Sequence, residues 1–424
     1  MKRNSILLIS LLLSISVSLI SCKKKSVEEA VFTPKLDTNT STTIVIAGHY
    51  KNFEAIEAEI DRFNKFYPNV EIIYTSLDIY NETILTSLAG HEQPDIFMCF
   101  HWMIDKPKYA PLFAKCQNMD DEKNTGYNLN TIKSSLVYHN KDGFVPMVPI
   151  LAMTYGMLVN EDLFQKEGLK IPETYSELIE VCSKFKERGY NNPLMTCNIS
   201  TTLGPCLIYT DFSKAVQKNP DAINALNNLE PDAGEYLRPY LEWTKDFRSK
   251  NLIDFDACAE IKDNYNASIM RFFKGDVPMM LSSGDTASGT EKRESRSKEF
   301  TENPFKYSFH ILPVNDNQLE FLFYTAVELC VNKDGKNLAM TNEFMRFLLR
   351  TEELNNLAKV KRLVTCSNDY SYDSMYSSLQ KAIPIYQYET GIFDNTYTQV
   401  RNACYEVVNG NMSVDEAVSK YGKL

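Results

Sequence analysis

Between residues 43 and 100 the spacing of the apolar residues changes repeatedly, and this alternation limits the possible folds more than any other feature. Continuous apolar runs, typical of buried strands, occupy 43–47, 70–74 and 96–100. The segments between them, 53–63 and 81–89, repeat apolar residues every three or four positions, as amphipathic helices do. Strand, helix, strand, helix, strand indicates a parallel sheet covered by helices. The sequence therefore predicts an α/β fold.

The alternation resumes after residue 143 and continues to the C-terminus. Further strands are expected at 154–159, 277–281 and 305–312. Two capping boxes, Thr174–Glu177 and Ser413–Glu416, predict helix starts because each Ser or Thr precedes a Glu by three residues. The polar segment 282–303 is expected to be an exposed loop or helix.

Chain length and net charge limit the number of domains and the kinds of partner. With 424 residues, the chain is long enough for two domains. The 45 Lys and Arg residues are outnumbered by 55 Asp and Glu residues, which gives a net charge of −10. This acidic balance argues against nucleic acid as a partner, because binding to phosphates needs a basic surface.

Residues 1–21 have the features of a signal peptide. Lys2 and Arg3 precede an apolar run that is short for a membrane span. The run ends in Leu19-Ile20-Ser21-Cys22, which resembles the bacterial lipobox, in which the cysteine is acylated and becomes the new N-terminus. The resemblance implies a lipoprotein, held at the extracytoplasmic face of a lipid bilayer by acyl chains on Cys22, with 22–42 as a tether. An ordinary signal peptide and a membrane anchor helix are the alternatives.

Nine cysteines remain after Cys22. Their number is odd and no Cys-x-x-Cys motif occurs, so a disulfide framework is not indicated. Several lie in apolar segments, which favours buried free thiols. One disulfide, between Cys197 and Cys206, stays open as an alternative.

Seven segments together resemble the extracellular solute-binding proteins of ABC importers, in the sugar-binding group that includes maltose-binding protein. They lie in the family's order and span most of the chain after residue 22: 63–70 (FNKFYPNV), 93–96 (QPDI), 155–164 (YGMLVNEDLF), 171–178 (IPETYSEL), 272–280 (FFKGDVPMM), 312–313 (LP) and 409–417. Each is weak alone, and their combination is specific.

The resemblance implies the two-lobed type II periplasmic-binding-protein fold, each lobe a mostly parallel sheet flanked by helices. One lobe would contain 41–150 plus 282–328, and the other 151–281 plus 329–424. Three crossings are expected near 150–153, 280–283 and 329–332. The implied partners are a sugar ligand held between the lobes and the membrane subunits of an ABC permease, and the protein would be a monomer with no cofactor and no metal.

The carboxyl ends of parallel strands are the expected ligand side of such a sheet. His49 and Tyr50 follow the first strand, although Tyr50 alternatively packs on the following helix. His101 and Trp102 follow the third strand. Aromatic rings suit the flat apolar faces of sugars, and polar side chains suit their hydroxyl groups.

Three further candidates are placed by the resemblance. Asp285 lies where relatives have a glycine followed by a stacking tryptophan, but Thr286 occupies the tryptophan's position, which puts a maltodextrin-like ligand in doubt. Asp285 either bonds a hydroxyl group or caps a helix. Tyr397 falls at another stacking position, with packing inside its own lobe as the alternative, and Tyr324 precedes the third expected crossing.

Catalytic motifs are missing from the sequence. It contains no His-Glu-x-x-His, Gly-x-Ser-x-Gly or Gly-x-Gly-x-x-Gly motif, and the five histidines lack metal-ligand spacing. A binding protein without catalytic activity is therefore predicted. Two other functions stay open: a ligand-sensing partner of a membrane histidine kinase, and a secreted carbohydrate-active enzyme, which needs two carboxylates facing a cleft.

Overall fold

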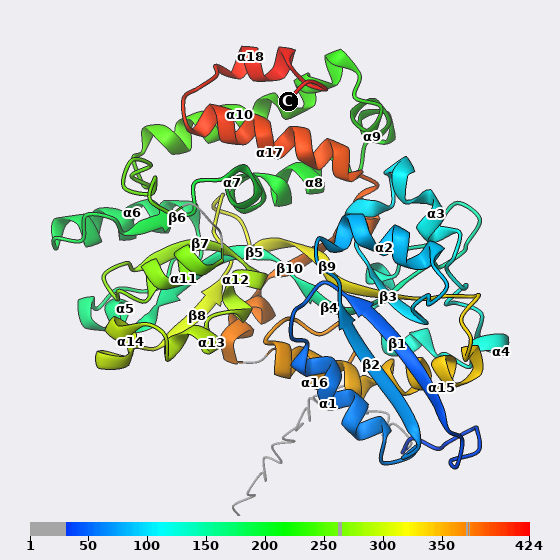
Figure 1. Ribbon diagram of the computed structural model, residues 1–424. Helices are drawn as coiled ribbons and strands as arrows, with labels where there is room; N and C mark the ends of the chain where they lie inside the picture. The colour runs from blue at the N-terminus through cyan, green and yellow to red at the C-terminus, as the bar shows by residue number, and fades with distance from the viewer. Residues whose placement is uncertain (1–30, 262–264, 370–371, 373) are drawn as a thin grey trace, which may run out of the picture. The chain divides into compact units, whose positions relative to one another are not determined.

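The N-terminal segment folds as its alternating pattern predicts. A computed structural model describes residues 31–261, 265–369, 372 and 374–424 (Figure 1). The first five elements are β1 (Thr42–Gly48), α1 (Glu54–Phe63), β2 (Val70–Ser76), α2 (Tyr80–Ala89) and β3 (Ile96–Cys99). β1 pairs in parallel with both β2 and β3. Signal peptide, lipobox and Cys22 lie outside the described residues, as do tether residues 22–30.

The first sheet has the strand order β10-β9-β3-β1-β2, and β4 also pairs with β9. Its later strands are β4 (Val148–Met153), β9 (Glu320–Val331) and β10 (Ile383–Tyr386). β9 runs antiparallel to β3 and β4 and parallel to β10, so the sheet is mixed. Helices α15 (Leu338–Leu348) and α16 (Thr351–Lys361) pack against α1. Between β3 and β4 the chain forms short helices: η1 (His101–Met103), η2 (Pro107–Tyr109), α3 (Ala110–Phe113), α4 (Glu122–Thr125), η3 (Leu129–Thr131) and η4 (Ser134–Leu136).

The second sheet has the order β6-β7-β5-β8. Its strands are β5 (Tyr155–Asn160), β6 (Leu194–Thr196), β7 (Met279–Ser283) and β8 (Tyr307–His310). β6 and β7 are parallel, whereas β5 runs antiparallel to β7 and β8. The α/β two-sheet fold is thus confirmed, but the prediction that each sheet is mostly parallel is wrong, because β5 runs antiparallel to its neighbours β7 and β8, and β9 runs antiparallel to its neighbours β3 and β4.

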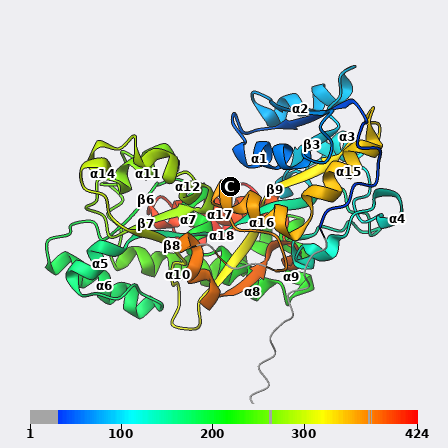
Figure 2. The ribbon, with the colours of Figure 1, turned by 90° about the horizontal axis from the view of Figure 1, so that it is seen from below.

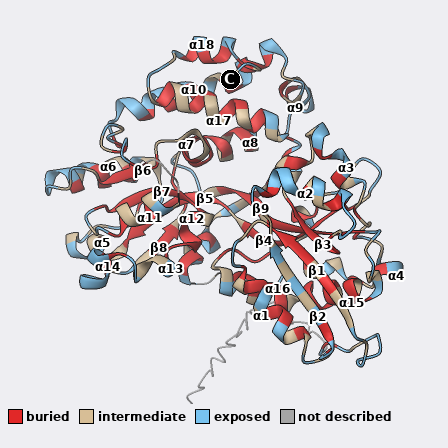
Figure 3. Cartoon of the chain, in the orientation of Figure 1, coloured by how far each residue is buried: buried red, intermediate tan, exposed pale blue. Residues whose placement is uncertain are grey.

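Most of the remaining helices belong to the central and C-terminal segments. They are α5 (Glu161–Glu167), α6 (Tyr175–Glu187), α7 (Ser200–Leu207), α8 (Tyr209–Val216), α9 (Pro220–Asn227), η5 (Pro231–Leu237), α10 (Arg238–Ser249), α11 (Asn266–Phe272), α12 (Gly284–Ser288), α13 (Glu291–Glu294), α14 (Lys298–Glu302), η6 (Ser374–Lys381), η7 (Gln387–Thr390), α17 (Asp394–Val408) and α18 (Val414–Ser419). Both predicted capping boxes are present, at the starts of α6 and α18. Helix α17 packs against both α7 and α10 and lies between them in Figure 1, whereas α7, α17 and α18 overlap in the view of Figure 2. The strands of both sheets are largely buried (Figure 3).

Chain crossings differ from the predicted division into lobes. Thr154 alone separates β4 in the first sheet from β5 in the second, next to the crossing expected near 150–153. The expected crossing at 280–283 is wrong, because β7 and β8 both pair with β5 and the chain leaves the second sheet only after β8. The crossing at 329–332 is also wrong, because β9 still pairs with β3 there and α15 and α16 then pack on α1. Segments 284–310 and 338–361 therefore change sides relative to the prediction.

The segment 282–303 also differs from its expected exposure. It forms three short helices, and residues 286–290 are buried. Gly284 allows this close packing, because a Cβ at this position would lie 2.9 Å from the Cβ of Met153. The Gly284 amide donates a hydrogen bond of 2.8 Å to the Thr154 carbonyl. This bond ties the start of α12 to the junction between the sheets.

The nine cysteines in the described residues are buried and free. The alternative disulfide between Cys197 and Cys206 does not form, because the Cys197 thiol faces the Ile261 carbonyl at 3.6 Å and the Cys206 thiol faces the Gly156 carbonyl at 3.6 Å. Among the described residues, no helix is long and apolar enough to cross a membrane.

Candidate ligand-binding site

A pocket of about 390 Å³ lies where β1, β2 and β3 end. Its lining comes from the loops that follow these three strands: His49, Lys51, Ser76, Leu77, Asp78, Ile79, Tyr80, Asn81, Phe100 and Trp102. Parallel strands bring their carboxyl ends to one edge, which explains why segments distant in sequence meet here. Two of the predicted residues, His49 and Trp102, therefore share one pocket.

The edge of this pocket includes an unusual apolar residue. Ile79 is 70% exposed and has a φ of 47°, in the left-handed region. A β-branched residue is rarely found there, because the conformation costs on the order of 1–3 kcal/mol. Such strain at a pocket edge is typical of functional sites.

His49 and Tyr50 lie together at the end of β1. Their ring centroids are 3.9 Å apart, and the His49 ring also contacts Phe100 at 5.1 Å. Burial lowers the pKa of His49 to about 4, and the positive charge of Lys361 adds to this effect. His49 is therefore neutral at pH 7. The alternative for Tyr50 also has support, because its ring packs 5.0 Å from that of Phe53 at the start of α1.

His101 and Trp102 form the first turn after β3. The Trp102 ring stacks on Phe100 at 5.7 Å with an interplanar angle of 7°, and Lys106 Nζ lies 4.8 Å from the Trp102 ring. His101 lies 5.8 Å from Tyr324, ring to ring. Burial lowers the pKa of His101 to about 4, against an opposing effect of Asp394. The Lys106 ammonium pairs with Asp394 at 2.8 Å, so this loop contacts α17 directly.

Asp285 lies in the first turn of α12. The helix is capped by Ser283, whose Oγ accepts from the Thr286 amide at 3.2 Å, so Asp285 is not the capping residue. Its carboxylate makes no hydrogen bond or ion pair to any described residue. Burial raises the pKa of Asp285, and the charge of Lys361 opposes the rise. Thr286, where a stacking tryptophan is found in relatives, is buried and bonded to Ser283.

Tyr324 belongs to a group of tyrosine rings beside the junction between the sheets. Its ring lies 5.6 Å from Tyr155 and 6.5 Å from Tyr397. Tyr324 is 4% exposed, and its hydroxyl group has no hydrogen-bond partner among the described residues. A buried hydroxyl group without a partner is costly, by about 1–3 kcal/mol. This hydroxyl group is therefore an unused hydrogen-bonding group beside the junction between the sheets.

Tyr397 has a different environment. Its side chain is 3% exposed, its ring packs 4.7 Å from Tyr209, and its hydroxyl group bonds Ser213 Oγ at 2.8 Å. Both the ring and the hydroxyl group are thus occupied within the protein. The packing alternative fits this geometry better than a stacking role for the ligand.

Three further residues beside these groups were missed by the sequence reasoning. Tyr155 begins β5, Lys361 ends α16 and Arg401 lies one turn beyond Tyr397 on α17. Lys361 Nζ lies 3.8 Å from the Tyr50 ring and forms no ion pair with a described residue. Asp394, Tyr397 and Arg401 are spaced by three and four residues, which places them on one face of α17. This spacing is the sequence feature that could have identified Arg401.

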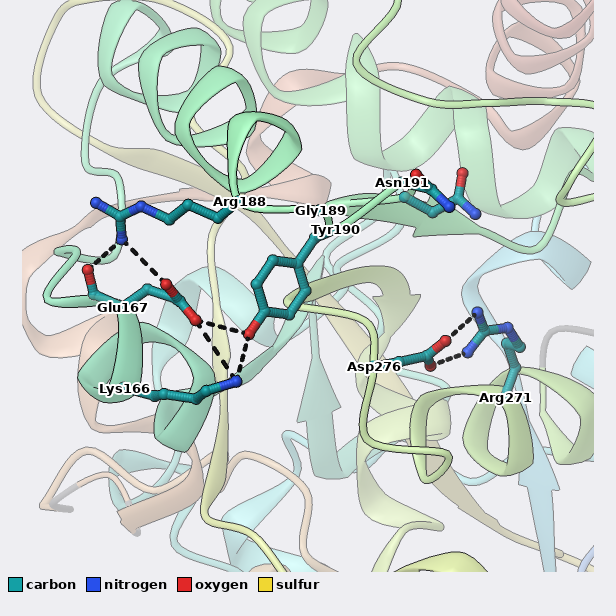
Figure 4. A pocket seen from close by; sticks show the side chains of 9 residues that line it. Lys166, Glu167, Arg188, Gly189, Tyr190, Asn191, Arg271 and Asp276 are labelled. Carbon is teal, nitrogen blue, oxygen red and sulfur yellow. Dashed lines mark hydrogen bonds and ion pairs between the residues drawn. The ribbon is translucent and has the colours of Figure 1, made fainter.

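A second hollow, also of about 390 Å³, lies beside α5 and is lined by Lys166, Glu167, Arg188, Gly189, Tyr190, Asn191, Asn192, Arg271 and Asp276 (Figure 4). Its charged groups are paired with one another. Tyr190 donates to Glu167 at 2.8 Å, and Arg271 bonds Asp276 through two nitrogens. The charged groups of this hollow are therefore less free to bind a ligand than the side chains of Asp285 and Tyr324.

The chain is similar to known solute-binding proteins. The family described as bacterial extracellular solute-binding protein matches residues 47–354. YcjN of Escherichia coli, named as an ABC transporter periplasmic-binding protein, is 21% identical over 374 residues, covering 84% of this chain and 76% of YcjN. The melibiose/raffinose/stachyose-binding protein MelE of Bacillus subtilis is 24% identical over 197 residues, covering 45% of this chain and 41% of MelE.

Solved structures show the same fold. RafE from Streptococcus pneumoniae, without ligand, superposes with a TM-score of 0.69 at 16% identity, covering 91% of this chain and 98% of RafE. RafE in complex with raffinose gives a TM-score of 0.67, again at 16% identity, and covers 89% of this chain and 98% of that one.

Proposed function

Because this chain belongs to the bacterial extracellular solute-binding proteins of ABC importers, a family without catalytic activity, we propose that it captures a sugar or oligosaccharide and delivers it to the membrane subunits of such an importer. The proposed site joins the pocket after β1–β3 to the Tyr324 and Asp285 groups. MelE is described as a melibiose/raffinose/stachyose-binding protein and RafE has been solved in complex with raffinose, which supports this ligand class.

The observation that carries the proposal is a set of unpaired polar groups among aromatic rings. The Tyr324 hydroxyl and the Asp285 carboxylate have no hydrogen-bond or ion-pair partner among the described residues. The Tyr155 ring lies 5.6 Å from that of Tyr324, and the charge of Asp285 acts on the hydroxyl groups of Tyr155 and Tyr50. Sugars present hydroxyl groups at their edges and apolar C–H faces, so they match both features. Burying these polar groups is costly without a ligand and favourable with one.

Lobe closure is the proposed mechanism. Thr154 is a single-residue passage between the sheets, and a second passage connects β8 to β9. A ligand that contacts groups on both sheets favours the closed arrangement, because only that arrangement makes all of its contacts. The closed form would present the surface that the permease recognises. The proposed location is the extracytoplasmic side of the membrane, held by acylated Cys22.

Binding of oligosaccharides to the purified protein tests the proposal. Thermal unfolding with melibiose, raffinose, stachyose and malto-oligosaccharides is expected to show a raised Tm for at least one of them, since a ligand at one hundred times its Kd stabilises the native state by about 2.7 kcal/mol. Asp285→Asn is expected to weaken binding at least tenfold. Asp221→Asn is the matched control, because Asp221 also lies in the first turn of a helix, α9.

Mass spectrometry of the recovered ligand separates this proposal from the enzymatic alternative. The ligand is expected to be released with unchanged mass. Conversion of the sugar would contradict the proposed function, as would the absence of binding by every neutral and acidic saccharide tested.

A further inference from the structure

Arg401 is a half-buried cation that has no ion-pair partner among the described residues. It lies on α17, and its Nε atom is buried without a hydrogen-bond acceptor. None of the described carboxylates lies within ion-pair distance of its guanidinium group. The backbone beneath it is fixed by close helix packing, because a Cβ on Gly204 of α7 would lie 2.5 Å from the Arg401 Cα. Local rearrangement of α17 therefore cannot easily bring a partner.

The nearby aspartate on the same helix is already paired. Asp394 lies two turns before Arg401 and bonds Lys106 at 2.8 Å. The positive charge of Arg401 acts on the hydroxyl groups of Tyr155 and Tyr209, where it opposes the rise in pKa that burial causes. Arg401 is thus electrostatically coupled to the tyrosine group that surrounds the unpartnered Tyr324 hydroxyl.

Three half-buried charged groups of the proposed site have no ion-pair partner among the described residues: the cations Arg401 and Lys361 and the carboxylate Asp285. The other unpaired charges of the pocket, Lys51 and Asp78, are exposed and of opposite sign. Lys361 and Asp285 attract each other through space, which leaves the charge of Arg401 uncompensated. A partly buried charge is costly unless a partner is supplied.

We infer that the captured saccharide carries a carboxylate, as a uronic-acid oligosaccharide does, and that Arg401 binds it. This inference rests on the proposed function and narrows its ligand class. The planar guanidinium fork matches a carboxylate through two parallel hydrogen bonds. A monoanion also matches the single uncompensated charge, whereas a doubly charged phosphate would meet repulsion from Asp285.

The same charges orient the ligand. The acidic sugar unit lies at α17, and the hydroxyl groups of a neighbouring unit lie at Asp285, where a carboxylate would be repelled. Arg401 is thus a specificity-determining residue, and the rings of the site serve both neutral and acidic sugar units.

Calorimetry with matched ligand pairs tests the inference. The probes are two saccharides that each carry one carboxylate, a glucuronate-containing xylo-oligosaccharide and a galactose oligosaccharide with a single terminal galacturonate, and the carboxyl-reduced form of each. The acidic member of at least one pair is expected to bind at least tenfold more tightly than its reduced counterpart, with an affinity that falls as NaCl is raised. Arg401→Gln is expected to abolish this preference. The control Arg238→Gln, at an exposed arginine paired with Glu235, is expected to keep it.

The outcomes separate the inference from the proposed function. Neutral saccharides that bind as tightly as acidic ones, or an Arg401→Gln variant that keeps the preference, would overturn the inference and leave the proposed function in place. A panel in which neither acidic nor neutral saccharides bind would overturn both.

Discussion

Lys361 Nζ lies 3.8 Å from the centroid of the Tyr50 ring, which joins the end of α16 to the loop after β1. Such a contact between a cation and an aromatic face contributes about 0.5–2 kcal/mol. It also places a positive charge beside His49, whose pKa it lowers in addition to burial. The electrostatics of this loop therefore depend on a residue more than 300 positions away in sequence.

Lys361→Met is expected to raise the pKa of His49 from about 4, because the variant removes a positive charge that disfavours the imidazolium form. Burial remains, so the pKa stays below 6.5. An NMR titration of the His49 ring measures the change. Lys359→Met, at an exposed position of the same helix, is the control and should leave the titration unchanged. An unmoved pKa in Lys361→Met would contradict the assigned contact.

Tyr324→Phe is expected to keep or increase the stability of the free protein, because it removes a buried hydroxyl group that has no partner. The expected gain in unfolding free energy is about 0–1 kcal/mol. Ligand affinity is expected to fall about tenfold, since the lost hydrogen bond is worth about 1.5 kcal/mol. Urea unfolding and calorimetry measure the two effects. A clear loss of stability without loss of affinity would assign Tyr324 to the core.

Alanine substitutions should distinguish a ligand-binding role of Trp102 from a core-packing role of Tyr397. Tyr397→Ala is expected to cost about 3–5 kcal/mol of stability, because it deletes a fully packed ring with a bonded hydroxyl group. Trp102→Ala removes a half-buried ring at the pocket and is expected to lower the ligand-dependent Tm shift much more than the Tm of the free protein. The two readouts come from one thermal unfolding series. Equal loss of free-protein stability in both variants would refute the distinction.

Glu328→Gln is expected to remove part of the pH dependence of stability. Burial raises the pKa of Glu328 to about 8, while the Tyr388 hydroxyl donates to its carboxyl group at 2.8 Å. The folded state therefore holds this proton more tightly than the unfolded state. Its contribution to stability is complete below about pH 4.5 and is lost as the pH rises through about 8.

Denaturant unfolding at pH 5 and pH 8.5 measures this effect. The Gln variant should match the wild type at pH 5 and exceed it at pH 8.5 by on the order of 2 kcal/mol. Glu299→Gln, at an exposed glutamate, is the control. A constant difference between wild type and Glu328→Gln at both pH values would contradict the raised pKa.

Local patterns were sufficient to predict many of the elements but not the crossings between sheets. The strands and helices from β1 to β3 and both capping boxes follow from residues within a few positions of one another. The pairing of β8 with β5 depends on contacts about 150 residues apart, for which the apolar pattern contains no register information. The predicted lobe boundaries therefore differ from the structure where strands that are distant in the sequence pair within one sheet.

The candidate site shows the same limit. His49 and Trp102 were predictable because residues that directly follow parallel strands meet at one edge. Lys361 and Arg401 lie on helices far along the chain, where a charged residue looks like any solvated helix residue. Only the three-dimensional arrangement shows that neither has an ion-pair partner in the part of the chain that the structure describes.

Thr154 receives a hydrogen bond from the amide of Gly284 and donates one from its own hydroxyl group to the Leu322 carbonyl, at 2.8 Å in each case. The residue next to Gly284 is Asp285. A ligand bound to the Asp285 carboxylate would therefore lie one residue from Gly284, whose amide is bonded to Thr154 at the passage between the sheets. Ligand binding and lobe movement would then depend on directly neighbouring residues.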